Sequence, residues 1–203
     1  MLNHSGFSDQ LKAQDIPFLD LNHDELLKTR VRASYTGLSD LWLPRTVLDA
    51  DFVVSMPKVK THHWSGVTLS MKNMFGVVPG SKYGWPKNIL HWNGIQQSIL
   101  DICATVPIHF VIADAITAME GNGPLAGTSR PLHCVVLAND PVAADATCGR
   151  LMGFEPDGIA HLREAAKFLG DASAELIDQL AEPVIAPEVQ FKVVREFQYL
   201  RTG

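Results

Sequence analysis

Two kinds of apolar pattern alternate along the chain. Three continuous apolar runs have the length of strands that are buried on both faces, at residues 52–56, 109–113 and 133–138. Helical spacing, or a helix-start signal such as Asp140–Pro141, indicates helices at residues 6–14, 45–50, 65–77, 88–106, 141–153, 156–169 and 173–180. We further expect a strand at residues 16–21 and extended or hairpin structure at residues 23–44. This alternation predicts an α/β fold with a largely parallel or mixed sheet and helices on both faces.

Length, charge and cysteine usage limit the classes of protein. The 203 residues predict a single α/β domain over residues 1–203. A net charge of −5 argues against binding to nucleic acid, which normally needs a basic face. No signal peptide or membrane-length apolar run is visible, so we expect no membrane segment and a cytoplasmic location. The three cysteines form no CxxC motif, so this chain holds no recognisable set of iron–sulfur ligands.

A cluster of cations follows the first apolar run directly. Lys58, Lys60 and His62 alternate, so an extended backbone would direct all three to one side. We interpret residues 58–63 as a polar loop at the carboxyl end of a strand, where ligands bind in open α/β sheets. Such a group of side chains suits a small anionic molecule. The alternative is a charged loop exposed to solvent.

Two further candidates for chemistry lie on predicted helices. Lys72 and Asn73 are the main polar residues of the apolar helix at residues 65–77. Lys72 either extends its amine to water or faces a ligand in a desolvated site, where its pKa would fall and the amine could act as a base. His91 lies in the first turn of the next helix and, like His62, could transfer protons.

Three aspartates supply the acidic counterpart. Asp114 and Asp140 follow predicted strands, and Asp145 lies between alanines in an apolar helix. They could orient the cations, and Asp114 or Asp145 could bind a divalent metal together with His62 and His91. The alternatives are a helix N-cap for Asp140 and a structural ion pair for Asp145.

A glycine-rich stretch at residues 119–131 predicts a loop. Within it, Glu120, Gly121 and Gly123 could present backbone N–H groups or a carboxylate to a ligand. The spacing matches neither a Walker loop nor the GxGxxG pattern, so a simple turn is the alternative.

Five motifs in fixed order resemble one known family. They are ADFVVSMPKVKTH, GVTLSMKNMFGVVPG, the region of His91, IADAITAMEGNGPLAG and LANDPVAADATCGRLMG. The chain is similar over residues 5–170 to the family catalogued as domain of unknown function 362, which leaves residues 171–203 as a C-terminal tail. Many members carry an appended ferredoxin-type module and are described as iron–sulfur proteins, but the corresponding cysteines are not in this chain. The family's usual opening segment is also missing before Gly6, so we expect a truncated unit.

The resemblance implies importance for the residues of these motifs, which are Lys58, Lys60, His62, Lys72, Asn73, His91, Asp114, Glu120, Gly121, Gly123, Pro124, Asp140 and Asp145. Our first hypothesis is a site for a small anionic ligand or cofactor at the C-terminal edge of the strands. Its catalytic candidates are Lys58, Lys72, His62 and His91. Its ligand-binding candidates are Lys60, Asn73, Glu120, Gly121, Gly123 and Asp140, with Asp114 and Asp145 as metal ligands.

Two other hypotheses stay open. In the second, the chain is a non-catalytic accessory module that docks onto an iron–sulfur or ferredoxin-type partner through an aromatic loop around Tyr83 and Trp85. In the third, the polar cluster is a structural network of ion pairs.

Overall fold

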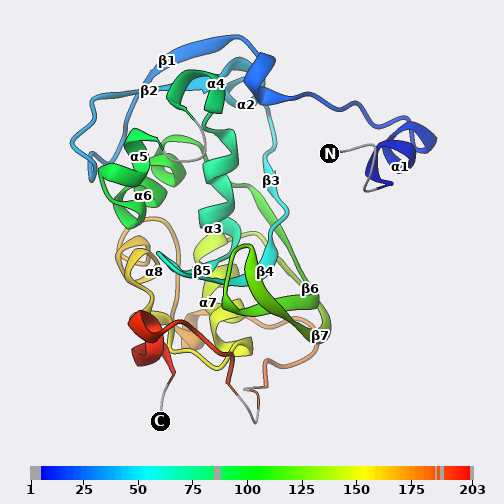
Figure 1. Cartoon of the computed structure of the whole chain (residues 1–203). Helices are drawn as coiled ribbons and strands as arrows, with labels where there is room; N and C mark the ends of the chain where they lie inside the picture. Colours follow the sequence, from blue (N-terminus) through cyan, green and yellow to red (C-terminus); the bar gives the residue numbers. More distant parts are fainter. Residues whose placement is uncertain (1–5, 85–87, 186, 188–189, 202–203) are drawn as a thin grey trace.

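The chain folds around a long antiparallel hairpin of β6 (Phe110–Asn122) and β7 (Ala126–Ala138). The structure is a computed structural model that describes residues 6–84, 88–185, 187 and 190–201. On the other edge of β6 lie β3 (Val54–Ser55) and β4 (Lys58–His62), both parallel to β6, and β5 (Gly66–Thr68) pairs antiparallel with β4. The sheet is therefore mixed, and the predicted α/β fold is confirmed (Figure 1).

A separate antiparallel pair of strands, β1 (Leu26–Arg30) and β2 (Asp40–Pro44), confirms the hairpin expected at residues 23–44. The α-helices are α1 (Phe7–Ala13), α2 (Arg45–Leu48), α3 (Ser70–Asn73), α4 (Gly80–Tyr83), α5 (Ile89–Trp92), α6 (Ile95–Thr105), α7 (Pro141–Leu151) and α8 (Ala160–Ala165). Short 3-10 helices are η2 (Leu21–His23), η3 (Met74–Val77), η4 (Pro156–Gly158), η5 (Ala174–Leu176) and η6 (Arg195–Leu200). None of the helices in the described ranges is both long and apolar enough to cross a bilayer.

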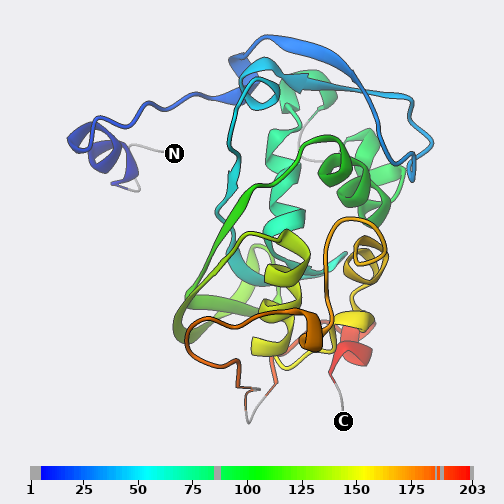
Figure 2. The same cartoon turned by 180° about the vertical axis from the view of Figure 1, so that it is seen from behind.

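The two faces of the β6–β7 hairpin have different surroundings. Helix α7 packs against β6 and β7 and lies over the face that is nearer in Figure 2. On β6, Val111, Ala113 and Ala115 are fully buried. No helix lies over the opposite face in Figure 1, and there Val135 and Leu137 remain 45% and 62% exposed. This part of the sheet therefore presents apolar side chains at the surface.

The cationic stretch lies on a strand and not in the loop that we expected. Of the apolar run 52–56, only Val54–Ser55 pairs as a strand, and after Pro57 the chain continues directly into β4. The segment 65–77 is also not one helix, because it begins with β5 and turns helical only at Ser70. Gly66 has φ +80°, a left-handed conformation that suits a tight turn between β4 and β5. The consecutive residues Val67 and Thr68 are β-branched and fit the strand that follows.

The glycine-rich stretch 119–131 is mostly strand. Strand β6 runs on to Asn122 and β7 begins at Ala126, so Asp114 lies within β6 and not at its tip. A side chain at Gly123 would place its Cβ 2.0 Å from the Thr61 carbonyl oxygen, so close packing against β4 requires this glycine. The glycine content indicated a loop, whereas Gly123 and Gly127 are glycines because a Cβ at either position would clash with a backbone carbonyl.

Four other segments differ from the prediction. Residues 16–20 form no strand, and the predicted helix at 88–106 is divided into α5 and α6 at Gly94, which has φ +99°. The helix expected at 173–180 is reduced to η5, and the one at 156–169 to η4 and α8. The described part of the tail returns to the body of the protein, where Phe191 is fully buried and Val193 bridges to Gly121.

Candidate functional site

Four residues predicted for the site come together from three elements. Lys60 and His62 lie on β4, Lys72 on α3 and His91 on α5. The positive charges of Lys72, Lys60 and His91 all lie near enough to His62 to lower its pKa. We call these four residues, together with His161 of α8, the Lys–His cluster.

Aromatic rings connect the members of the cluster. His62 stacks on His63 with 4.9 Å between ring centroids, and the ring of Trp64 meets His91 edge-on at 6.0 Å. The Phe75 ring also meets His91 edge-on, with 5.5 Å between ring centroids. The Lys72 amine sits 4.2 Å from the centroid of the Phe75 ring. The cluster thus joins cationic and imidazole groups to an apolar, aromatic wall.

His62 is held in its neutral form. Its Nδ1 accepts hydrogen bonds from the backbone N–H groups of Trp64, at 2.9 Å, and Ser65, at 3.2 Å. Because Nδ1 is an acceptor, the ring proton resides on Nε2. Burial, followed by the charge of Lys72 and those of other neighbours, lowers the pKa of His62 to about 3. The ring therefore offers one N–H donor and no charge near neutral pH.

The surroundings of Lys60 and Lys72 disfavour the charged form of both amines. Burial and the charge of Lys60 lower the pKa of Lys72 to about 8. Burial and the charge of Lys58 lower the pKa of Lys60. Neither Lys60 nor Lys72 forms an ion pair with a carboxylate of the described residues. Two such cations gathered without a counter-charge form a positively charged site.

Two buried acceptors without partners border this site. His161 is 1% exposed, and its Nδ1 lies 2.6 Å from Gln96 Oε1, which fixes the proton on Nδ1. Its Nε2 is buried and has no hydrogen-bond partner among the described residues, and the charge of Lys72 contributes, after burial, to a pKa near 3. The Thr68 hydroxyl, on the residue paired with Lys60 across β4 and β5, is also buried without a partner. Such orphaned polar atoms are rare in folded proteins and call for a ligand or water.

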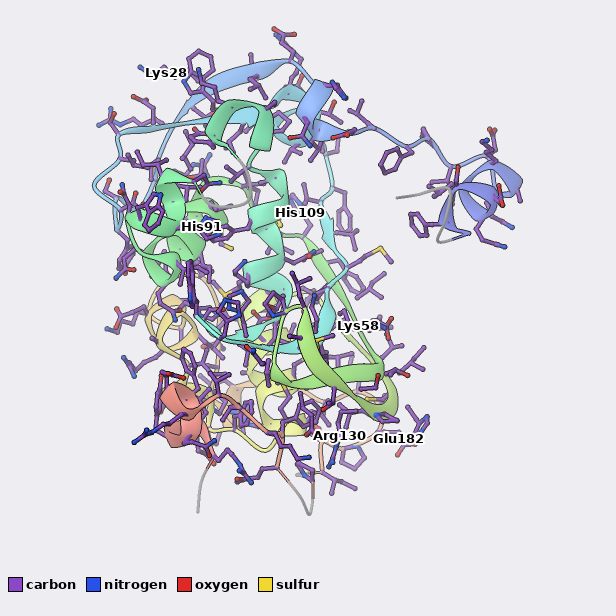
Figure 3. The ribbon with its side chains drawn as sticks, in the orientation of Figure 1. Lys28, Lys58, His91, His109, Arg130 and Glu182 are labelled. Atoms are coloured by element: carbon purple, nitrogen blue, oxygen red, sulfur yellow. The ribbon has the colours of Figure 1, made fainter. Side chains whose placement is uncertain are left out.

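Lys58 does not belong to this cluster. Its amine pairs with Asp114 at 2.5 Å, and both side chains are 43% exposed. This ion pair lowers the pKa of Asp114. In Figure 3 the labelled Lys58 lies beside the β6 strand, well apart from His91. Lys58 and Asp114 therefore neutralise each other on the open face of the sheet.

Asp145 and Asp140 both cap the N-terminus of a helix. Asp145 is fully buried on α7, and its carboxylate accepts the Ser70 N–H at 2.7 Å, the Ser70 hydroxyl at 2.6 Å and the Met71 N–H at 3.1 Å. It thus caps α3, the helix that carries Lys72. Burial raises the pKa of Asp145 to about 7, although these hydrogen bonds oppose the effect. Asp140 is the N-cap of α7, accepting from the N–H groups of Val142 and Ala143.

The remaining ligand-binding candidates make structural contacts. Glu120 is buried, accepts the Lys192 N–H at 3.1 Å and lies 3.6 Å from the Lys192 amine. The N–H groups of Gly121 and Gly123 donate to the carbonyls of Lys192 and Gly121, so neither is free for an anion. Asn73 is exposed and donates to the Ser55 hydroxyl at 3.1 Å.

Within the described residues, no group of three or more His, Cys, Asp or Glu side chains is arranged to hold a metal ion. Two open grooves, of about 400 and 370 Å³, lie elsewhere on the molecule. The first is lined by β3 and η3 and includes Asn73, and the second lies beside Tyr35 and Phe168. Neither of these two grooves is lined by a member of the Lys–His cluster.

Sequence reasoning missed His161, Thr68 and Phe75. His161 is the one histidine of the segment 159–166, and no spacing relates it to β4. Thr68 was placed on a predicted helix with Lys72, whereas it lies on β5 opposite Lys60. No local pattern distinguished His161 from the other polar residues of this helix, Arg163 and Glu164.

Comparisons with known proteins place the chain in a family. The chain is 26% identical over 189 residues to a protein named thylakoid-associated protein sll1697 from Synechocystis sp. (strain ATCC 27184 / PCC 6803 / Kazusa). The match covers 89% of this chain and 56% of the relative, so the chain spans little more than half of that protein's length. No solved structure matches this chain. A family profile described as domain of unknown function (DUF362) matches residues 1–150, and the chain therefore belongs to this family.

Proposed function

We propose that the Lys–His cluster binds a small anionic molecule. The observation that carries this proposal is the meeting of Lys60 and Lys72, from different elements, with no carboxylate partner among the described residues. Two adjacent cations in a partly buried site repel each other and lose hydration, and an anion between them would relieve both effects.

Each member of the cluster has a role in this proposal. The amines of Lys60 and Lys72 supply the positive charge, and the Nε2–H of His62 donates a hydrogen bond to the anion. The Thr68 hydroxyl and His161 Nε2 are both buried without a partner among the described residues, and both can accept a hydrogen bond from a hydroxyl or ammonium group of the ligand or from bound water. Binding of an anion raises the pKa of Lys72 toward its ordinary value.

The contacts of the aspartates argue against a purely structural ion-pair network. Asp145 is engaged by Ser70 and Met71, Asp114 pairs with Lys58, and Asp140 caps α7. None of the three forms an ion pair with Lys60 or Lys72. The positive charge of the cluster is therefore not balanced by the carboxylates that we first considered.

Thermal unfolding in the presence of phosphate, sulfate and small carboxylates tests the proposal. We expect at least one of these anions to raise the melting temperature of the wild type. Lys60→Met and Lys72→Met should lose this shift. Lys82→Met should keep it, because Lys82 also lies over an aromatic ring, that of Trp42, but on α4. Equal shifts in all four proteins would show that the anions act elsewhere.

A second proposal is that the chain docks onto a redox partner. The apolar residues Val135 and Leu137 on the open face of the β6–β7 hairpin favour it. The aromatic loop that we first considered gives less support, since the Tyr83 hydroxyl accepts the Trp42 N–H within the protein and Trp85 lies outside the described residues. Loss of ferredoxin binding in a Leu137→Asp variant, with the anion response intact, would support docking. No measurable binding by the wild type would contradict it.

For location we propose a reducing compartment such as the cytoplasm. Cys103, Cys134 and Cys148 are all unpaired, as is usual where disulfides do not persist. Burial raises the pKa of Cys103 and of Cys148, so both thiols are inert core residues.

A further inference from the structure

The amine of Lys72 has the surroundings of a nucleophile. It projects from α3 over the Phe75 ring at 4.2 Å, with Lys60 as a neighbouring cation. No carboxylate of the described residues pairs with it. A lysine that serves only solubility or an ion pair would extend to water or to an acid. Here the amine is instead held on an apolar surface inside a positive site.

We propose that Lys72 forms an imine with the carbonyl carbon of a small oxo acid whose carboxylate is held by Lys60 and His62. The inference rests on the anion site proposed above and assigns it a class of substrate. A carboxylate satisfies the charge of Lys60 and the His62 N–H donor. The Lys72 amine, which is close enough to Lys60 for the charge of Lys60 to lower its pKa, would attack the carbonyl next to that carboxylate.

Imine formation needs a neutral amine, because only the free electron pair attacks carbon. A lysine in water is almost fully protonated near neutral pH. Desolvation and an adjacent cation are the two devices by which proteins make a lysine nucleophilic, and Lys72 has both. Its pKa near 8 in the free protein leaves a substantial neutral fraction under physiological conditions, and imine formation draws on this fraction although a bound carboxylate favours the protonated form.

The reaction balances without an oxidant or a reductant. The Lys72 nitrogen forms a bond to the carbonyl carbon, and the carbonyl oxygen takes up a proton to give a carbinolamine. Loss of that hydroxyl with the second amine proton releases one water and leaves the carbon–nitrogen double bond. Water carries the proton from the amine to the carbonyl oxygen, while His161 Nε2, buried and without a partner among the described residues, can accept a hydrogen bond from the amine or from that water. His161 is therefore assigned a positioning role beside Lys72.

The chemistry of the site favours a carboxylate over a phosphate. The cluster contains no arginine fork, and the nearby glycine amides of Gly121 and Gly123 are already bonded to carbonyls. The Phe75 ring forms an apolar wall that suits a short carbon chain. A compact oxo acid such as pyruvate meets these requirements.

Reductive trapping tests the proposal directly. Wild-type protein is incubated with pyruvate and cyanoborohydride, which reduces an imine to a stable secondary amine, and the adduct is located by peptide mass spectrometry. We expect one adduct per chain, on Lys72. Lys72→Arg should give none, although it keeps the positive charge, and Lys82→Met should react like the wild type. Lys60→Met should lower the initial trapping rate about tenfold, equivalent to the loss of one modest charge contact.

The controls separate failure of this inference from failure of the anion site. Lactate has the same carboxylate but no carbonyl, so it should raise the melting temperature of the wild type and of Lys72→Arg without any adduct. A lactate shift with no pyruvate adduct on Lys72 would overturn the imine and leave the anion site standing. No shift with any anion, and adducts spread over surface lysines, would overturn both.

Discussion

Replacing Lys72 with methionine is expected to stabilise the protein in the absence of anions. The pKa of Lys72 falls from 10.5 to about 8 on folding, chiefly through burial and then through the charge of Lys60. A tenfold change in a protonation equilibrium corresponds to about 1.4 kcal/mol, so the charged amine costs roughly 3 kcal/mol in the folded state. Loss of the contact with Phe75 offsets about 1 kcal/mol of this. Lys72→Met should therefore raise the free energy of unfolding by about 2 kcal/mol near pH 7.

The dependence on pH identifies the cause. The folded-state pKa of Lys72 is lower than the unfolded one, so the unfolded chain binds more protons between about pH 8 and 10.5. Wild-type stability should rise over this interval as the penalty disappears. The advantage of Lys72→Met should be full below about pH 8 and vanish above about pH 10.5.

Urea unfolding of wild type, Lys72→Met and Lys82→Met at several pH values provides the measurement. Lys82 is the matched control because it also lies over an aromatic ring, 4.7 Å from Trp42, on another helix. If Lys72→Met is less stable than the wild type at every pH, Lys72 is not a destabilised cation and the reasoning fails. Equal changes in the free energy of unfolding for Lys72→Met and Lys82→Met would also refute this explanation.

Three substitutions test structural roles of single residues. Asp145→Ala should lower the free energy of unfolding by about 2–4 kcal/mol, because it leaves the Ser70 and Met71 donors of α3 unpaired. The pKa of Asp145 is raised to about 7, so the free energy of unfolding of the wild type should fall as pH rises from about 4 to 7. This fall should be smaller in Asp145→Ala. An unchanged pH dependence would contradict the assignment. Gly123→Ala should lower the free energy of unfolding by about 1–3 kcal/mol, because the added Cβ clashes with the Thr61 carbonyl. Gly76→Ala is the control and should be near neutral, since an added Cβ there meets no atom within 4 Å. Equal effects of the two substitutions in urea titrations would refute the close packing at Gly123. Asp101→Ala should cost about 2–4 kcal/mol in the same assay, because Asp101 accepts the N–H groups of both Tyr35 and Thr36, and a loss below about 0.5 kcal/mol would contradict that role.

Local signals predicted the parts of the fold that depend on neighbours in sequence. The Asp140–Pro141 start of α7 needs only an N-cap and a proline at the first position, and both are present. The β1–β2 hairpin was likewise expected from its extended pattern. In contrast, apolar periodicity placed a helix over residues 65–77, where β5 forms because Gly66 allows a tight turn back onto β4. The pairing of β5 with β4 is a tertiary contact, so the apolar periodicity of residues 65–77 could not predict it.

The candidate site was predictable in its cations and not in its acids. Alternation of Lys60 and His62 holds whether the segment is a loop or, as found, the strand β4. Their approach to Lys72 depends on where α3 begins, and that start is fixed by Asp145, which lies 75 residues after Ser70 and accepts its N–H. The sequence suggested Asp145 as a metal ligand or ion-pair partner because a buried carboxylate needs donors. It could not show that backbone N–H groups supply them.

The pKa of the Lys72 amine, measured by NMR with and without a saturating carboxylate, tests the central claim most directly. The account predicts a value near 8 in the free protein and a rise toward 10.5 when the anion binds. A free-protein value close to 10.5 that no anion changes would contradict the positively charged site on which the proposals depend.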